Sequence, residues 1–373
     1  MRALIAVAAL LASGAQAADT RWSAEQANAW YAQQPWPTGA DYIPASAINQ
    51  LEMWQAATWD PAEIDRELGW AETEFGMNTM RVFLHDLTWS QDPAGFKKRV
   101  DQFLAIAARH HIRPVFVLFD SCWDPNPKLG PQHAPIPGVH NSGWVQSPGR
   151  AALMDPGQEK RLHDYVTDML ASFSQDKRIL AWDVWNEPDN TGGGSYDTGE
   201  DARVKARVAD LLAKAFAWAR ATHPIQPLTS GLWTGGDWSP LQEAALNPIQ
   251  RMQLDQSDLI SFHNYGWPED FQARVDQLKL YGRPIICTEW MARSAGSTAD
   301  TVLPLGWHDH VGMINWGFVL GKTQTNFPWE SWDHPYVKSP PVVWFHDLVE
   351  PDGTPYRASE AKLFRMLRAQ PAG

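Results

Sequence analysis

The sequence contains only two cysteines, Cys122 and Cys287, among its 373 residues. At most one disulfide bond can therefore form, and the fold has to rest on a hydrophobic core. Residues alternate between the two faces of a strand, and this alternation puts Cys287 on the same interior face as Glu289. We therefore expect buried free thiols and no disulfide bond.

Several other features are scarce, and each scarcity excludes a class of function. The net charge is −12 and no basic run offsets it, which argues against nucleic acid or an anionic membrane as a partner. Beyond the first 18 residues, no segment is long and apolar enough to span a bilayer. No His-Glu-x-x-His motif occurs, and the pair His110-His111 lies at a predicted helix end, so we expect no metal site and no cofactor.

The first 18 residues read MRALIAVAALLASGAQAA, which is typical of a secretory signal peptide. One positive charge precedes a short apolar run, and an Ala-x-Ala-like site follows it. A retained membrane anchor is the alternative, and the shortness of the apolar run argues against it. We expect cleavage after Ala17 or Ala18, a secreted or periplasmic location, and a mature chain of residues 19–373.

The remainder alternates strand-like and helix-like segments with no linker between them, which predicts a single (β/α)8 barrel. A doubly wound open sheet is the alternative, but no glycine-rich phosphate turn follows the first predicted strand. Long loops without helical periodicity cover residues 121–155 and 319–352. Strands are expected over residues 38–44, 79–83, 114–120, 179–187, 227–231, 259–265, 284–290 and 311–318. Helices are expected over residues 61–75, 93–110, 156–174, 200–222, 268–281, 299–308 and 359–368.

Two of these strands end in a glutamate next to tryptophan. Residues 179–188 read ILAWDVWNEP, where Pro188 ends the strand just after Glu187. Alternation places Asp183, Trp185 and Glu187 on one face. Residues 284–290 read PIICTEW and end at Glu289 in the same way. Either glutamate alone is as easily a solvated strand-end residue, but the pair indicates two carboxyl groups gathered at one end of the barrel.

The Asn186-Glu187-Pro188 turn, together with Glu289 at a later strand end, resembles the clan of retaining glycoside hydrolases built on (β/α)8 barrels. The resemblance is closest to the cellulase-like family, glycoside hydrolase family 5, which includes endoglucanases and mannanases and has relatives often labelled xylanases. It implies Glu187 as the acid/base and Glu289 as the nucleophile. The 21 tryptophans fit a carbohydrate substrate, because indole rings stack on the apolar faces of sugars.

The same resemblance implies further substrate-binding residues around the two glutamates. Asn186 would contact the sugar 2-hydroxyl, and Arg81 would orient the nucleophile unless it serves only as a buried partner of Asp183. His263 and Tyr265 match a His-x-Tyr pair, with Tyr265 bonded to Glu289. Trp316 would form the floor of the site. Tryptophans in the long loops, namely Trp123, Trp144, Trp329 and Trp332, are candidates for sugar contacts.

One position departs from the family pattern. Many relatives have a histidine at the end of the third strand, where this chain has Asp120, followed by Cys122. Asp120 would bind a sugar hydroxyl or cap the barrel, and His85 with Asp86 would replace the missing histidine.

The sequence thus predicts a monomeric enzyme that hydrolyses O-glycosyl bonds in β-linked poly- or oligosaccharides. An exo-acting β-glycosidase of the same clan is one alternative, and a non-catalytic carbohydrate-binding barrel is the other. The presence of both glutamates argues against the non-catalytic barrel.

Overall fold

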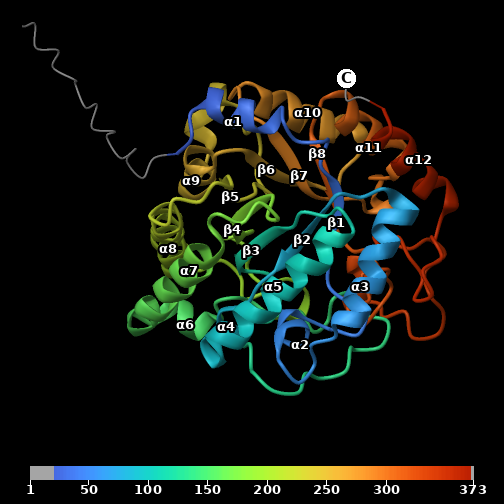
Figure 1. Cartoon of the computed structure of the whole chain (residues 1–373), viewed down its shortest axis with the longest axis horizontal. Helices are drawn as coiled ribbons and strands as arrows, with labels where there is room; N and C mark the ends of the chain where they lie inside the picture. Colours follow the sequence, from blue (N-terminus) through green and yellow to red (C-terminus); the bar gives the residue numbers. More distant parts are fainter. Residues whose placement is uncertain (1–20, 371–373) are drawn as a thin grey trace, which may run out of the picture.

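A computed structural model describes residues 21–370, which fold into a (β/α)8 barrel (Figure 1). Parallel strands lie side by side in the order β5-β4-β3-β2-β1-β8-β7-β6. A further parallel bridge, between Leu232 and Phe262, joins the segment after β5 to β6 and closes the barrel. The predicted fold is confirmed. The strands are β1 (Thr38–Asp41), β2 (Thr79–Phe83), β3 (Val115–Asp120), β4 (Ala181–Asn186), β5 (Leu228–Thr229), β6 (Ile260–Asn264), β7 (Ile285–Trp290) and β8 (Gly312–Asn315).

Helices surround the strands, as Figure 1 shows. The long ones lie close to the predicted ranges: α3 (Pro61–Trp70), α5 (Pro93–Arg109), α7 (Glu159–Phe173), α8 (Ala202–Arg220), α10 (Pro268–Lys279), α11 (Ala299–His308) and α12 (Ala358–Arg368). Shorter helices that the sequence did not predict are α1 (Ala24–Tyr31), α2 (Gln50–Trp54), α4 (Asp86–Gln91), α6 (Arg150–Met154) and α9 (Pro248–Gln256).

Local signals explain where the helices begin and end. Asp60 accepts the first free N–H groups of α3, and Pro61 occupies its first turn. The helix continues into a π-helical turn that ends at Gly76, whose φ of 65° suits glycine. The last predicted helix, over residues 359–368, begins one residue earlier than expected, at Ala358.

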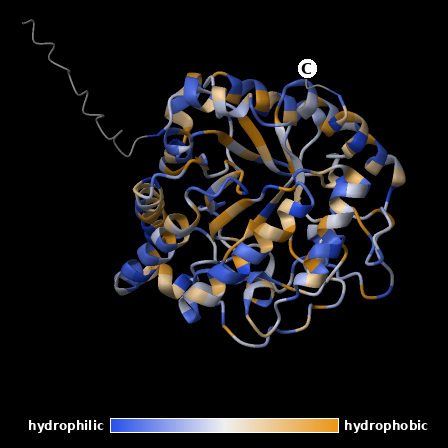
Figure 2. Ribbon diagram, viewed as in Figure 1, coloured by the Kyte–Doolittle hydropathy of each residue, from blue (hydrophilic) through white to orange (hydrophobic). Residues whose placement is uncertain are grey.

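Two apolar layers stabilise the barrel. The larger layer lies between the strands and the helices, and a smaller cluster fills the barrel interior. In Figure 2 the central strands are largely orange and much of the helical surround is blue. Helix α1 adds Tyr31 to the interior cluster, and the Tyr31 hydroxyl donates to the carbonyl oxygen of His310 at 3.0 Å. The amino ends of the strands are thereby covered by packed side chains.

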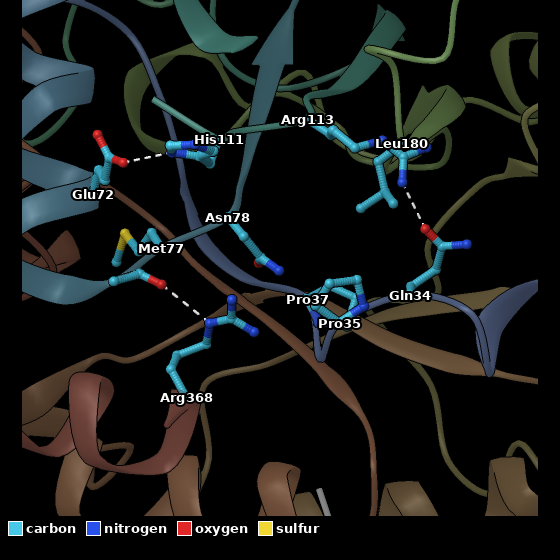
Figure 3. A pocket seen from close by; sticks show the side chains of 11 residues that line it. Gln34, Pro35, Pro37, Glu72, Met77, Asn78, His111, Arg113, Leu180 and Arg368 are labelled. Carbon is cyan, nitrogen blue, oxygen red and sulfur yellow. Dashed lines mark hydrogen bonds and ion pairs between the residues drawn. The ribbon is translucent and has the colours of Figure 1, made fainter. Parts of the chain in front are cut away.

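A cavity of about 270 Å³ also lies at the amino ends of the strands (Figure 3). Its walls include Pro37, Asn78, Arg113 and Leu180, which lie one or two residues before β1, β2, β3 and β4. Glu187 and Glu289 follow or end their strands, so this cavity is at the opposite end of the barrel.

A β-bulge breaks the side-chain alternation in β7. Phe262 lies opposite Cys287, but His263 lies opposite Glu289, so Thr288 is an extra residue. Cys287 therefore packs outward in the larger apolar layer, and its predicted interior position is wrong. Both cysteines are buried free thiols, as predicted.

Strand β4 also departs from simple alternation. Trp185 packs outward beside Phe119, with ring centroids 5.0 Å apart, while Asp183 and Asn186 both contact Arg81. The prediction that Trp185 shares the face of Asp183 is therefore wrong.

Within residues 21–370, no helix combines the length and hydropathy needed to cross a bilayer. The predicted signal peptide, residues 1–18, lies outside the described residues.

Candidate active site

Glu187 and Glu289 meet at the carboxyl end of the barrel. An oxygen of each carboxyl group and Nδ1 of His263 all lie within 4.8 Å of one another. Both glutamates are buried, with exposed fractions of 7% and 5%. Glu187 directly follows β4 and has a φ of 43°, a left-handed conformation that turns the chain out of the strand. The fold therefore brings together the two carboxyl groups that the sequence singled out.

The Glu187 carboxyl group has a partner on each oxygen. Oε1 lies 2.7 Å from Nδ1 of His263. Oε2 accepts a hydrogen bond from Nδ2 of Asn190 at 2.7 Å and one from the thiol of Cys122 at 3.2 Å. Burial raises the pKa of Glu187 to about 7, so a large fraction carries a proton near neutral pH. This state suits a general acid.

The Glu289 carboxyl group accepts two strong hydrogen bonds. Nη1 of Arg81 donates to Oε1 at 2.8 Å, and the hydroxyl of Tyr265 donates to Oε2 at 2.7 Å. Burial raises the pKa of Glu289, and Arg81 and Tyr265 oppose this shift because both favour the ionised form. The two glutamates thus have different surroundings, as a proton donor and a nucleophile require.

Arg81 connects the site to the interior of the barrel. Its buried guanidinium donates to Asp41 at 2.8 Å, to Asp183 at 2.8 and 3.0 Å, and to Oδ1 of Asn186 at 2.6 Å. Arg81 thus pairs with Asp183 and with Glu289, so Asp183 is not its sole partner. Burial raises the pKa of Asp41 well above its usual range.

Asp120 lies behind the site, and the structure gives it no room to bind a sugar. Its Oδ2 accepts from Nε1 of Trp144 at 2.6 Å and from Gln50 at 3.3 Å. Its Oδ1 accepts from Nδ2 of Asn186 at 2.9 Å and from the backbone N–H of Cys122 at 3.0 Å. With a 2% exposed fraction and these four donors, Asp120 orients neighbouring side chains. The predicted contact with a sugar hydroxyl does not fit this geometry.

His85 is also placed away from the substrate. It is fully buried, and its Nδ1 accepts the backbone N–H of Leu87 at the start of α4. His85 does not line the cavity that lies above the two glutamates, so the predicted replacement of the family histidine by His85 finds no support.

Above the glutamates lies a cavity of about 780 Å³ with aromatic walls. Trp316, directly after β8, lines it and packs edge-on against Phe83 and Trp144, with centroids 5.8 and 5.6 Å away. Trp144 does not line this cavity, so it supports the floor without facing substrate. The aromatic lining residues are Trp123, Trp233, Trp238, Tyr265, Trp316, Trp329 and Trp332.

Some lining residues were not identified from the sequence. Trp233, Trp238 and Arg274 come from the β5–α10 region, where no regular pattern marked them. Nε1 of Trp233 donates to Asp189 at 2.6 Å, and the Arg274 guanidinium lies 3.9 Å from the Trp238 ring. Asn190 stands three residues after Glu187 in the same turn, and this spacing was its only signal.

The loops after β3, β4 and β8 are joined over one side of the barrel mouth. Trp123 and Trp332 stack with ring centroids 5.4 Å apart and planes at 16°. A Cβ on Gly194 would lie 2.4 Å from the Trp332 ring, so the loop after β4 reaches this stack only with glycine there. The backbone N–H of Asn141 also donates to the carbonyl oxygen of Thr323 at 2.8 Å. We call Trp123, Gly194 and Trp332 the loop junction.

The loop junction spans the barrel mouth, and Trp123, Gly194 and Trp332 all line the cavity. Three strands, β3, β2 and β1, separate β4 from β8 in the sheet order, so loops from these two strands meet only by crossing the mouth. The opposite wall, formed by Trp233, Trp238 and Arg274, lies beyond Glu187 on the β5 and β6 side.

Glu187, His263 and Glu289 each offer an atom that could ligate a cation, and these three atoms lie close enough together to do so. Arg81 already supplies a positive charge to Glu289, and burial lowers the pKa of His263 to about 4, so His263 stays neutral beside Glu187. Glu187 and Glu289 can thus serve as a proton donor and an acceptor.

The family model described as Cellulase (glycosyl hydrolase family 5) matches residues 43–333. No curated protein sequence matches the chain. Among solved structures, a GH5_18 variant from Streptomyces cattleya in complex with Manβ1-4GlcNAc has a TM-score of 0.62 at 12% identity, over 90% of this chain and 82% of that one.

Two further solved structures have the same fold. Exo-β-1,4-mannosidase Op5Man5 from Opitutaceae bacterium strain TAV5 has a TM-score of 0.57 at 18% identity, over 89% of this chain and 59% of that one. The endo-1,4-β-mannanase from Eisenia fetida has a TM-score of 0.57 at 14% identity, over 89% of this chain and 91% of that one.

Proposed function

This chain belongs to glycosyl hydrolase family 5 and is a glycoside hydrolase, and on that premise we propose that it cleaves β-linked glycosides with retention, through Glu187 and Glu289. The observation that carries the proposal is the separation of at most 4.8 Å between an oxygen of each carboxyl group. Retaining enzymes place their carboxyl groups about 5–5.5 Å apart, whereas inverting enzymes leave roughly 6.5–9.5 Å for a water molecule.

The contacts assign a step to each glutamate. Glu289, held by Arg81 and Tyr265, attacks the anomeric carbon, while protonated Glu187 gives its proton to the leaving oxygen. A covalent glycosyl–enzyme and a Glu187 carboxylate result. Glu187 then removes a proton from water, which attacks the anomeric carbon and releases Glu289. Trp316 supports the reacting sugar from below.

We further propose that the enzyme acts from a chain end, on short β-1,4-mannosides or related oligosaccharides. The loop junction spans the mouth beside the cavity, and this arrangement supports a site that is blocked at one end to a long polysaccharide. The solved structures of similar fold include an exo-β-1,4-mannosidase and a complex with Manβ1-4GlcNAc. An endo-mannanase shares the fold as well, so the fold leaves the site of cleavage along the chain undetermined.

The two glutamates are tested by substitution and azide rescue. Glu187→Ala and Glu289→Ala should each lower kcat on a natural substrate by at least about a thousandfold. Azide should restore turnover of an aryl β-glycoside in both, giving the inverted glycosyl azide only with Glu289→Ala. Glu269→Ala, an exposed carboxylate on α10, is the control. Near wild-type turnover in either glutamate variant would refute the assignment.

The mode of action is tested on a series of manno-, cello- and xylo-oligosaccharides with reduced ends. A chain-end enzyme shortens each oligosaccharide by one unit from the non-reducing end, so within each series the first product is always the same monosaccharide. A mixture of internal fragments at early times would show endo action and contradict the proposal.

We also propose that residues 1–18 direct export. Expression of the whole chain in a Gram-negative host, followed by N-terminal sequencing of the exported enzyme, should give a first residue at Ala18 or Asp19. Enzyme found only in the cytoplasm with its leader intact would contradict this.

A further inference from the structure

Cys122 places a thiol directly against Glu187. Its sulfur lies 3.2 Å from Oε2 of Glu187 and lines the catalytic cavity. The backbone N–H of Cys122 donates to Asp120, which fixes the residue two positions beyond β3. The mechanism described so far does not use this thiol.

The surroundings of the sulfur determine where its hydrogen points. Nδ2 of Asn186 and Nδ2 of Asn190 approach the sulfur at 3.4 and 3.5 Å, and both are donors. A sulfur that accepts from two amides turns its own hydrogen toward the remaining polar neighbour, which is Oε2 of Glu187. Burial raises the pKa of Cys122 well above its usual value, so the thiol keeps this hydrogen.

We propose that Cys122 is a positioning residue that donates its S–H to Glu187 and sets how tightly this acid holds its proton. The inference rests on the proposed acid/base role of Glu187. The thiol, together with Asn190, stabilises the carboxylate that forms when the leaving group takes the proton. It also holds Oε2 in place while the same carboxylate activates water in the second step.

The pH–rate profile tests the thiol as a donor. In Cys122→Ala the ionised form of Glu187 loses one hydrogen bond, so Glu187 keeps its proton to higher pH. The alkaline limb of kcat/KM should therefore move up by about half to one pH unit. Cys122→Ser restores a donor of similar shape and should return the limb most of the way. Cys287→Ala removes the other buried thiol and should leave the limb unchanged.

The infrared S–H stretching band gives a second readout, in a spectral window where few other protein groups absorb. The S–H band that disappears in Cys122→Ala belongs to Cys122. The S–H band that disappears in Cys287→Ala belongs to Cys287. The Cys122 band should shift over the same pH interval in which the alkaline limb falls, because its acceptor changes charge there. A band that is constant with pH would overturn the proposal.

Two kinetic results would also overturn it. One is an alkaline limb that does not move in Cys122→Ala; if activity falls as well, Cys122 is a packing residue only. The other is an equal shift in Cys122→Ala and Cys122→Ser, which would also make Cys122 a packing residue only. Glu187→Ala separates this inference from the proposed function. If Glu187→Ala stays active, the catalytic assignment fails. If it is inactive while Cys122→Ala keeps the wild-type profile, only the role of Cys122 fails.

Discussion

At the scale of single residues, Glu187 occupies a backbone conformation that costs energy. Its φ of 43° is left-handed, which costs a residue with a Cβ about 1–2 kcal/mol. The hydrogen bond from the backbone N–H of Asn190 to the Glu187 carbonyl oxygen, at 2.9 Å, helps to hold this turn. Such conformations are concentrated at functional sites because the surrounding structure holds a side chain where regular structure would not.

Tyr265→Phe tests the hydrogen bond to the nucleophile. Without the hydroxyl, the ionised form of Glu289 loses a donor at 2.7 Å, so its pKa should rise further. A nucleophile that protonates more readily loses activity sooner on acidification, and the acidic limb of kcat/KM should move up by about one pH unit. A profile that falls evenly at every pH would instead indicate loss of packing.

Asp41→Asn tests whether Asp41 is protonated. Burial raises the pKa of Asp41 well above its usual range, and an asparagine can accept the same hydrogen bond from Arg81. Its kcat/KM should stay within about threefold of wild type. Asp183→Asn is the contrast, because it removes a charged partner from a buried arginine and should lower the unfolding free energy by about 3–5 kcal/mol. Steady-state kinetics measures kcat/KM of Asp41→Asn, and urea denaturation measures the unfolding free energy of both variants; equal losses of unfolding free energy would contradict the difference.

At the scale of elements, the sequence predicted most strands and long helices because their start and stop signals are local. Asp60-Pro61 and Gly76 bound the helix that was predicted over residues 61–75. The β-bulge at Thr288 could not be predicted, since it depends on pairing with β6. The same applies to Asp120, because three of its four partners, Trp144, Gln50 and Asn186, come from distant segments. The catalytic pair could be predicted from two strand ends. The cavity wall could not, because it depends on how the loops pack.

Trp332→Ala tests the loop junction as a unit. The change removes the stack on Trp123 and the contact over Gly194, so the loop after β8 loses its contacts with the loops after β3 and β4. Activity on polysaccharide relative to trisaccharide should rise by about fivefold or more, and early products should include internal fragments. Trp307→Ala, on α11 away from the cavity, is the matched control. An unchanged product pattern would contradict the closed-end interpretation.

At the scale of the whole molecule, several buried carboxyl groups make stability depend on pH. Burial, with help from Glu63, raises the pKa of Glu67 to about 8, and burial raises that of Asp347 to about 7. In the unfolded chain these groups ionise near pH 4, so unfolding at neutral pH releases protons. The stabilisation is complete below about pH 4 and is lost as the pH rises through about 7–8, at about 1.4 kcal/mol per group and pH unit.

Glu67→Gln isolates one of these groups. The amide oxygen can accept from the Tyr42 hydroxyl, which donates to Glu67 at 2.8 Å, without ionising. The melting temperature of the wild type should therefore fall more steeply between about pH 5 and pH 8 than that of Glu67→Gln. Glu269→Gln, an exposed change, should leave the slope as in wild type. Parallel curves for wild type and Glu67→Gln would contradict the assignment.

The loop junction also has a kinetic consequence. If the junction blocks one end of the cavity, as proposed above, the leaving group lies nearer the open end and departs first. The sugar bound to Glu289 can leave only afterwards, by the same route. Product release is then obligatorily ordered: the released monosaccharide should inhibit competitively, and added acceptor alcohols should intercept the glycosyl–enzyme without slowing its formation.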